Sequence, residues 1–194
     1  GTLNSNEAFE NIVVNSAGTI TLGAVLDADG GVTITAGTLD VSGSNFGIIV
    51  GGNWAKSGTF TQRSGVVIFD TAGTTSVVSG DTTFFNFTCT TPLKPINFTA
   101  GSTQTVSGLL TLTGTAGNLL VLRSTVTDSA WNLNVAGTSS VDYVNVRDSN
   151  AGGGNAITHA VSPSRSVNVA NNTNWSFNAA PTVASVTAVQ NSSG

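Results

Sequence analysis

The residues that could carry acid–base or nucleophilic chemistry are few in this sequence. It contains one histidine, His159, and one cysteine, Cys89, and neither belongs to a recognisable arrangement of nucleophile, base and orienting carboxylate. One histidine and one cysteine also supply too few ligands for an ordinary zinc site. We therefore interpret His159 as a loop or edge residue and Cys89 as a buried structural thiol within a strand.

One pair of carboxylates has the spacing with which a calcium loop begins. Asp27 and Asp29 stand two positions apart and are followed by Gly30. In a complete loop the twelfth position is a bidentate glutamate, whereas here it is Thr38. A solvated turn is therefore favoured over a metal site, and we expect no cofactor.

A second group places Asp142 and Asp148 on either side of Arg147. Glycoside hydrolysis needs two carboxyl groups within about 10 Å of each other. On an extended strand Asp142 and Asp148 would lie about 20 Å apart. We therefore predict that the protein is not an enzyme.

The chain carries very little charge. Charged residues make up 8% of it, against about 25% in an average globular protein, and the formal net charge is −4. The six Lys and Arg residues are scattered singly, so there is no basic stripe to attract nucleic acid. The apolar runs are too short to span a bilayer. The scarcity of lysine and the polar, uncharged composition are typical of secreted bacterial proteins, and we expect an extracellular or cell-surface location.

Short strands with one apolar edge account for most of the chain. The unit is clearest where Val32 and Ile34 alternate with Thr33 and Thr35 before a glycine turn. Helix-forming residues are scarce and β-branched residues are abundant, which predicts an all-β fold. We expect strands at 10–15, 18–22, 32–35, 38–41, 47–50, 58–61, 65–69, 75–78, 84–89, 96–99, 103–106, 109–113, 119–122, 125–127, 131–135, 141–147 and 166–169.

The sequence also contains an internal similarity. Phe9 and Asn11 recur 75 positions later as Phe84 and Asn86, and the stretch that begins at Gly31 has an echo 77 positions later. This spacing predicts duplication of a block longer than one supersecondary unit.

Two architectures fit so many short strands: two sandwiches in tandem, or a β-solenoid in which each coil stacks on its neighbours. Hairpin turns of the Asn-Gly or Asp-Gly type, which a sandwich uses, occur once, at 29–30. Short strands and small turn residues favour the solenoid.

Several motifs then resemble a known class of domain. The runs 141–151 and 167–177 resemble the closing coils of right-handed parallel β-helix domains in large bacterial secreted and surface proteins, and 51–60 and 65–69 are similar to their Gly-Asn-Trp and Gly-x-Val-x-Phe elements. The resemblance covers roughly residues 1 to 177. It implies a right-handed parallel β-helix (a single-stranded β-solenoid) over residues 1–178, with seven to nine coils of about 22 residues.

The C-terminal part of the sequence predicts a cap and an extension. Trp175 and Phe177 can cover the open end of the last coil, which would otherwise expose apolar core. Residues 179–194 are then a linker and a short strand without a partner, either the start of an immunoglobulin-like repeat or a strand that links subunits. Its assembly residues would be Thr182, Val183, Val186 and Val189.

These features predict a structural subunit of an extracellular bacterial filament, sheath or surface layer, which associates with itself through the solenoid ends. The main alternative is a carbohydrate-binding or adhesive module of a surface adhesin, with Trp54 or Trp131 as exposed contacts. An ice-binding solenoid would use the pairs Thr19 and Thr21, Thr33 and Thr35, and Thr111 and Thr113. A polysaccharide lyase-like enzyme is the remaining alternative, because some β-helices have that activity.

Overall fold

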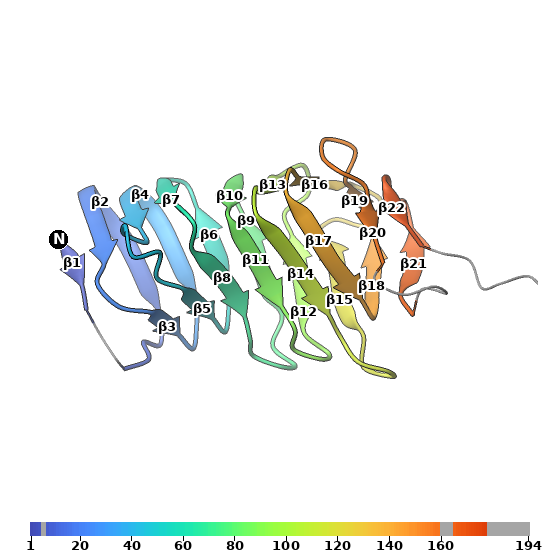
Figure 1. Ribbon diagram of the computed structural model, residues 1–194, viewed down its shortest axis with the longest axis horizontal. Helices are drawn as coiled ribbons and strands as arrows, with labels where there is room; N and C mark the ends of the chain where they lie inside the picture. The colour runs from blue at the N-terminus through green and yellow to red at the C-terminus, as the bar shows by residue number, and fades with distance from the viewer. Residues whose placement is uncertain (5–6, 160–164, 178–194) are drawn as a thin grey trace, which may run out of the picture.

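The computed structural model describes residues 1–4, 7–159 and 165–177. This part of the chain contains no helix, and so none long and apolar enough to cross a membrane. Its strands form parallel sheets that stack as a β-solenoid of about 8 turns. Figure 1 shows the coils following one another along the long axis, with the N-terminus at one end. The all-β fold and the solenoid architecture are therefore confirmed, and the tandem sandwiches are excluded.

Three parallel sheets form the sides of the solenoid. The ten-stranded sheet contains β1 (Thr2–Leu3), β2 (Ile12–Leu22), β4 (Val32–Asp40), β6 (Trp54–Lys56), β9 (Ser76–Ser79), β12 (Pro95–Phe98), β15 (Leu120–Ser124), β18 (Val144–Arg147) and β21 (Val167–Ala170), with β7 (Thr59–Thr61) also paired to β4. The six-stranded sheet contains β3 (Leu26–Ala28), β5 (Ile48–Val50), β8 (Val66–Phe69), β11 (Asn86–Cys89), β14 (Leu109–Thr113) and β17 (Thr138–Asp142). The four-stranded sheet contains β10 (Thr82–Phe84), β13 (Thr103–Val106), β16 (Trp131–Val135) and β19 (Ser149–Asn150).

The chain visits these sheets in turn, as β12, β13, β14 and β15 illustrate, and each circuit makes one coil. Register partners in the ten-stranded sheet measure the coil length. Ile12 lies beside Val32, 20 residues later, and Phe98 lies beside Ser124, 26 residues later. The predicted coil of about 22 residues falls within this range.

The interior is filled by the inward-pointing residue of each alternating pair, because successive strand side chains point to opposite faces. Trp54 packs edge-on against Phe60, with ring centroids 4.9 Å apart, and against Phe84 at 5.5 Å. Farther along, Phe98 and Trp131 are stacked, with centroids 3.8 Å apart and an angle of 11° between the rings. The core is therefore one continuous column of apolar side chains.

Asparagine side chains at the corners join each coil to the next. The Oδ1 atoms of Asn11, Asn53 and Asn86 accept backbone N–H groups of Gly31, Val77 and Leu109, at 2.8, 2.8 and 2.7 Å. Each donor lies about one coil later in the sequence, at or next to the start of a strand. The abundant asparagine thus satisfies backbone groups that the ladders leave unpaired.

The predicted strands differ from the observed ones at a few places. The pairs 10–15 with 18–22 and 32–35 with 38–41 are single strands, β2 and β4. The β4 backbone bends at Gly37 (φ 70°), and the register between the two strands shifts at this bend and resumes where Thr19 lies beside Thr38. The predicted strands 84–89 and 141–147 are each divided at a corner. The strand predicted at 125–127 is wrong, since those residues form a bend and a turn.

The internal similarity does not correspond to duplication of whole coils. Val32, which follows Gly31, belongs to the ten-stranded sheet, whereas Leu109, which follows Gly108, belongs to the six-stranded sheet. What recurs is a local corner device: an asparagine that accepts the amide at the start of the strand one coil later. The predicted block duplication is therefore wrong.

Candidate functional site

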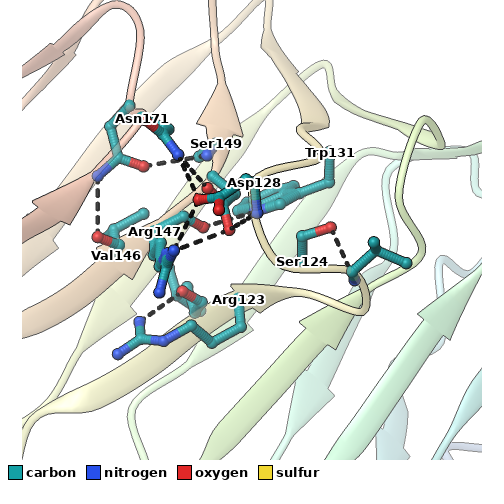
Figure 2. A network of polar contacts seen from close by, with 12 residues as sticks. Arg123, Ser124, Asp128, Trp131, Val146, Arg147, Ser149 and Asn171 are labelled. Carbon is teal, nitrogen blue, oxygen red and sulfur yellow. Dashed lines mark hydrogen bonds and ion pairs between the residues drawn. The ribbon is translucent and has the colours of Figure 1, made fainter.

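Charged and amide side chains form a network across three coils near the C-terminal end (Figure 2). Arg147 in β18 donates from Nη2 to Oδ1 of Asp128 at 2.7 Å, and its Nε lies 3.4 Å from Oδ2 of Asp148. The side-chain amide of Asn171 donates to Asp128 at 3.0 Å and to Asp148 at 2.8 Å. Asp148 is buried, so these donors compensate a carboxylate that has little contact with water.

The geometry makes this network a tie between coils. Both carboxylate oxygens of Asp148 accept hydrogen bonds, one from Asn171 and one from the backbone N–H of Asp128 at 3.1 Å. The hydrogen bond to Asp128 raises the pKa of Arg147, while burial acts against it. A carboxylate whose two oxygens are already occupied is poorly placed to act as a general base.

Arg123 lies one coil before Arg147 and is held by different partners. It donates to the backbone oxygens of Leu122 and Asn145, both at 2.8 Å, and to Oδ1 of Asn145 at 2.6 Å. Burial lowers the pKa of Arg123, and the positive charge of Arg147 adds to this effect. The guanidinium group is thus engaged mainly by neutral carbonyl groups.

Asp142 does not join the group that the sequence suggested. It forms an ion pair with Arg165, whose guanidinium carbon lies 4.2 Å from the centre of the Tyr143 ring. The structure therefore assigns Asp142 to one network and Asp148 with Arg147 to another. The three residues do not share a site.

A surface pocket of about 360 Å³ lies at the N-terminal end of the six-stranded sheet. Asp27 of β3 and Ile49 of β5 are register neighbours at its floor, and Val25, Phe46 and Glu7 also line it. Burial raises the pKa of Asp27, and the negative charges of Asp29 and Asp70 raise it further. The pocket is an open hollow whose lining combines apolar side chains with carboxylates.

Asp27 and Asp29, the candidate calcium ligands, follow one another at this end of the solenoid. Asp27 lies within β3, and Asp29 is exposed in the turn that follows. Within the described ranges, no group of three or more His, Cys, Asp or Glu side chains is arranged to hold a metal ion.

Sequence reasoning missed a buried lysine. Lys94 has no exposed surface, and its Nζ donates to the carbonyl oxygen of Gly51 at 2.7 Å, whereas the preceding Leu93 is 53% exposed. Hydropathy predicts the opposite arrangement, but Leu93 has a positive φ of 59°, which changes the phase of the alternation. Cys89 in the adjoining β11 is buried as expected, and burial raises the pKa of its thiol to about 11.

A second missed interaction joins Asp40 and Arg63. The guanidinium group of Arg63 donates from Nε and Nη2 to the two carboxylate oxygens of Asp40, at 2.6 and 2.7 Å. This hydrogen bonding lowers the pKa of Asp40, although burial alone would raise it. The two residues stand 23 positions apart, about one coil, and that spacing was the available signal.

The predicted end-cap residues lie together with the histidine. Trp175 belongs to β22 (Trp175–Ser176), which pairs with β20 (Ile157–Thr158), and its Nε1 donates to Oγ of Ser149 at 3.0 Å. Phe177 packs on the apolar core, and its ring centroid lies 4.8 Å from that of His159. His159 stands at the sheet edge but is buried.

The two tryptophans predicted as exposed sugar contacts are core residues. Trp54 and Trp131 are fully buried, and Trp54 donates from Nε1 to the Thr82 hydroxyl at 3.2 Å. In the Gly-Asn-Trp element, Asn53 takes the corner position and the following tryptophan points inward. The prediction that these side chains are exposed is wrong.

The three Thr-x-Thr pairs belong to different strands and different columns of the surface. Thr33 stands between Val13 and Ala55, and Thr111 stands between Thr88 and Ser140. Thr19, in the second half of β2, lies beside Thr38 instead of Thr33. The pairs therefore do not combine into one threonine array.

Comparisons of the chain with protein-family models, with curated proteins and with solved structures found no match. The candidate assembly residues Thr182, Val183, Val186 and Val189, together with the proposed extension strand, lie outside the described residues.

Proposed function

We propose that this solenoid is a structural module of an extracellular bacterial filament, sheath or surface layer, and that copies associate end to end. The observation that carries the proposal is the composition of two strands of the ten-stranded sheet: β2, which β1 covers only at Thr21 and Leu22, and β21, the last described strand of that sheet. Neither β2 nor β21 contains a charged residue or a proline. Natural sheets usually protect an open edge with such residues, because an unprotected edge pairs with other chains.

The N-terminal edge offers the clearest contact. β1 pairs with Thr21 and Leu22 of β2, so the first half of β2 has only β4 as a described neighbour. Val13, in that half, is 64% exposed. The amide of Ile12 donates to the carbonyl oxygen of Gly31, on the side of β4. Because backbone N–H groups alternate in direction along a strand, the amide of Val13 points away from β4, toward the open edge of the sheet. An outward amide on an apolar edge favours addition of another strand.

Contact between an N-terminal end and the opposite end of another copy would be heterologous, and heterologous contacts produce open filaments. Either β21 or residues 182–190 of the next copy would supply the partner strand. The low charge of the chain means that little repulsion opposes this contact.

The test is the assembly state by negative-stain microscopy and light scattering. Val13→Pro removes the outward amide without breaking an internal ladder bond, and we expect it to stop filament growth. Val13→Thr keeps the amide and the β-branched shape, and should assemble normally. Monomers of the unaltered protein at all concentrations would refute the proposal.

A mixing experiment defines the polarity of the contact. If residues 182–190 supply the partner strand, Val13→Pro protein and protein lacking residues 181–194 should each fail to form filaments. Their mixture should then form dimers only, because each supplies one intact end. If the deletion alone leaves filaments unchanged, the linking-arm part of the proposal is wrong and β21 is the partner.

Glycan binding is the second candidate, and the pocket at Phe46 favours it. Its volume of about 360 Å³ is within the range of small-molecule sites. A sugar ring could stack on Phe46 and donate hydroxyl groups to Asp27. A glycan array should reveal a ligand that is lost in Phe46→Ala and retained in Phe85→Ala, since Phe85 is a similarly half-buried phenylalanine that does not line the pocket.

A further inference from the structure

His159 occupies an unusual position for a titratable side chain. The residue is 8% exposed, and its ring contacts Phe177, with the ring centroids 4.8 Å apart. Trp175 lies next to both, with its ring centroid 6.4 Å from that of His159. Within the part of the chain that the structure describes, neither Nδ1 nor Nε2 makes a hydrogen bond of good geometry, and the contact with the backbone of Val141 is at most a weak one. Nearly all buried polar groups in proteins have a good partner, so this imidazole is poorly satisfied.

The surroundings favour the neutral ring. Burial lowers the pKa of His159 from its usual 6.5, whereas the negative charge of Asp142 and the weak hydrogen bond with the backbone of Val141, both in β17, act to raise it. Asp142 is itself paired with Arg165, which limits its influence on the imidazole. The other described elements packed against His159 are β20, β22 and Phe177, and they contribute no charged side chain. A charged imidazolium would therefore be buried without adequate compensation.

Residues 175–177 are held by fewer hydrogen bonds than the segment before them. β20 and β22 share two register pairs, and one hydrogen bond joins Trp175 to Ser149. Thr173 and Asn174, by contrast, are bonded to the backbone of Ser149, Ala151 and Gly154, so separation of the cap would be confined to 175–177. The coils beneath are held by longer ladders and by the continuous core. Elements with so few contacts open locally at a free energy well below that of global unfolding.

We propose that His159 makes this aromatic cap acid-labile: when its ring is protonated in mild acid, Trp175 and Phe177 separate from the end of the solenoid while the coils beneath stay folded. The proposal does not depend on the proposed assembly function. It assigns the single histidine a role as a pH-sensitive latch.

Nuclear magnetic resonance tests this with little ambiguity, because the chain has one histidine and three tryptophans. The imidazole C–H signal of His159 should titrate with a midpoint below 6.5. The indole N–H signal of Trp175, identified with Trp175→Phe, should change with the same midpoint. The indole signals of Trp54 and Trp131 should not change.

Two variants separate His159 from its neighbours. His159→Phe preserves the aromatic packing and should remove the change at Trp175 throughout the acid range. Asp142→Asn should keep the change and move its midpoint to lower pH, because a charge that favours the imidazolium is gone. The proposal is overturned if His159 titrates normally without a response from Trp175, if all three indole signals change together, or if the transition persists in His159→Phe.

Discussion

The ammonium group of Lys94 donates a 2.7 Å hydrogen bond to the backbone carbonyl of Gly51, about two coils earlier in the solenoid. The two residues are 43 positions apart in the sequence. Both residues lie at the corner between the six-stranded and the ten-stranded sheet, so the enclosed lysine runs along this corner. It links coils that the sheet ladders connect only through an intermediate strand.

Lys94 should make the stability of the protein increase with pH. Burial lowers its pKa, so the unfolded lysine binds a proton more tightly than the folded one. The free energy of unfolding should therefore rise between the lowered pKa and about 10.5. We expect Lys94→Met to remove this rise in urea titrations at successive pH values. The matched Lys56→Met should retain it, and an unchanged rise in Lys94→Met would contradict the prediction.

Cys89 should have the opposite effect at alkaline pH. Burial raises the pKa of its thiol from 9.0 to about 11, so the unfolded chain releases the proton first. The contribution of Cys89 to stability is present below pH 9.0 and is lost as the pH rises through about 11. Cys89→Ala should remove that loss, although the small cavity lowers stability at every pH. The measurement is the difference in unfolding free energy between neutral and alkaline buffer, made in the Lys94→Met background.

The ion pair of Asp40 and Arg63 should contribute in the other direction. The hydrogen bonds from Arg63 lower the pKa of Asp40, so the contribution is present above about 3.8 and is lost as the pH falls through the lowered pKa. Asp40→Asn should reduce the acid dependence of thermal unfolding. Because 45% of the Arg63 side chain is exposed, added salt should weaken the effect. Glu10→Gln, a change at an exposed carboxyl, is the control, and equal behaviour of both variants would argue against the prediction.

Gly80 should be irreplaceable for a steric reason. Its φ is 79°, and a Cβ atom there would lie 1.9 Å from the carbonyl oxygen of Lys56 in the coil below. Gly73 has a similar φ of 72°, but nothing lies within 4 Å of the position that a Cβ atom would take there. Gly73→Ala should therefore cost about 1–2 kcal/mol from backbone strain alone. Gly80→Ala should cost clearly more, as measured by chemical denaturation, and similar costs would show that the coils can separate without penalty.

The sequence predicted the architecture because period-2 alternation and small turn residues are local signals. Strands 103–106, 109–113 and 131–135 coincide with β13, β14 and β16. The same signals could not determine which face of a strand points inward at a corner. Trp54 was expected on the surface because its neighbours Asn53 and Ala55 gave no indication of the phase, and it is instead central to the core.

The site-level features depended on contacts between coils, which no local pattern encodes. Arg147 and Asp148 are adjacent in sequence, yet Asp128 and Asn171, which complete their network, come from the coils before and after. Leu93 and Lys94 exchange their expected environments because of one positive φ angle. The grouping of His159 with Phe177 also depends on the path of the last coil. Predicting these contacts required knowing which residues of successive coils lie side by side. That register depends on the lengths of the corners, which vary from coil to coil.

The variation in coil length has a consequence for how such a protein can change. Coils of 20 and 26 residues belong to one sheet, and a longer coil places its additional residues in a corner, as at 114–119, where the backbones of Thr115 and Asn118 bond to each other. Corner insertions therefore cost mainly loop entropy, about 0.6 kcal/mol for each doubling of loop length. This makes the corners natural positions for evolutionary insertions, and for peptides grafted by design, on an unchanged rod.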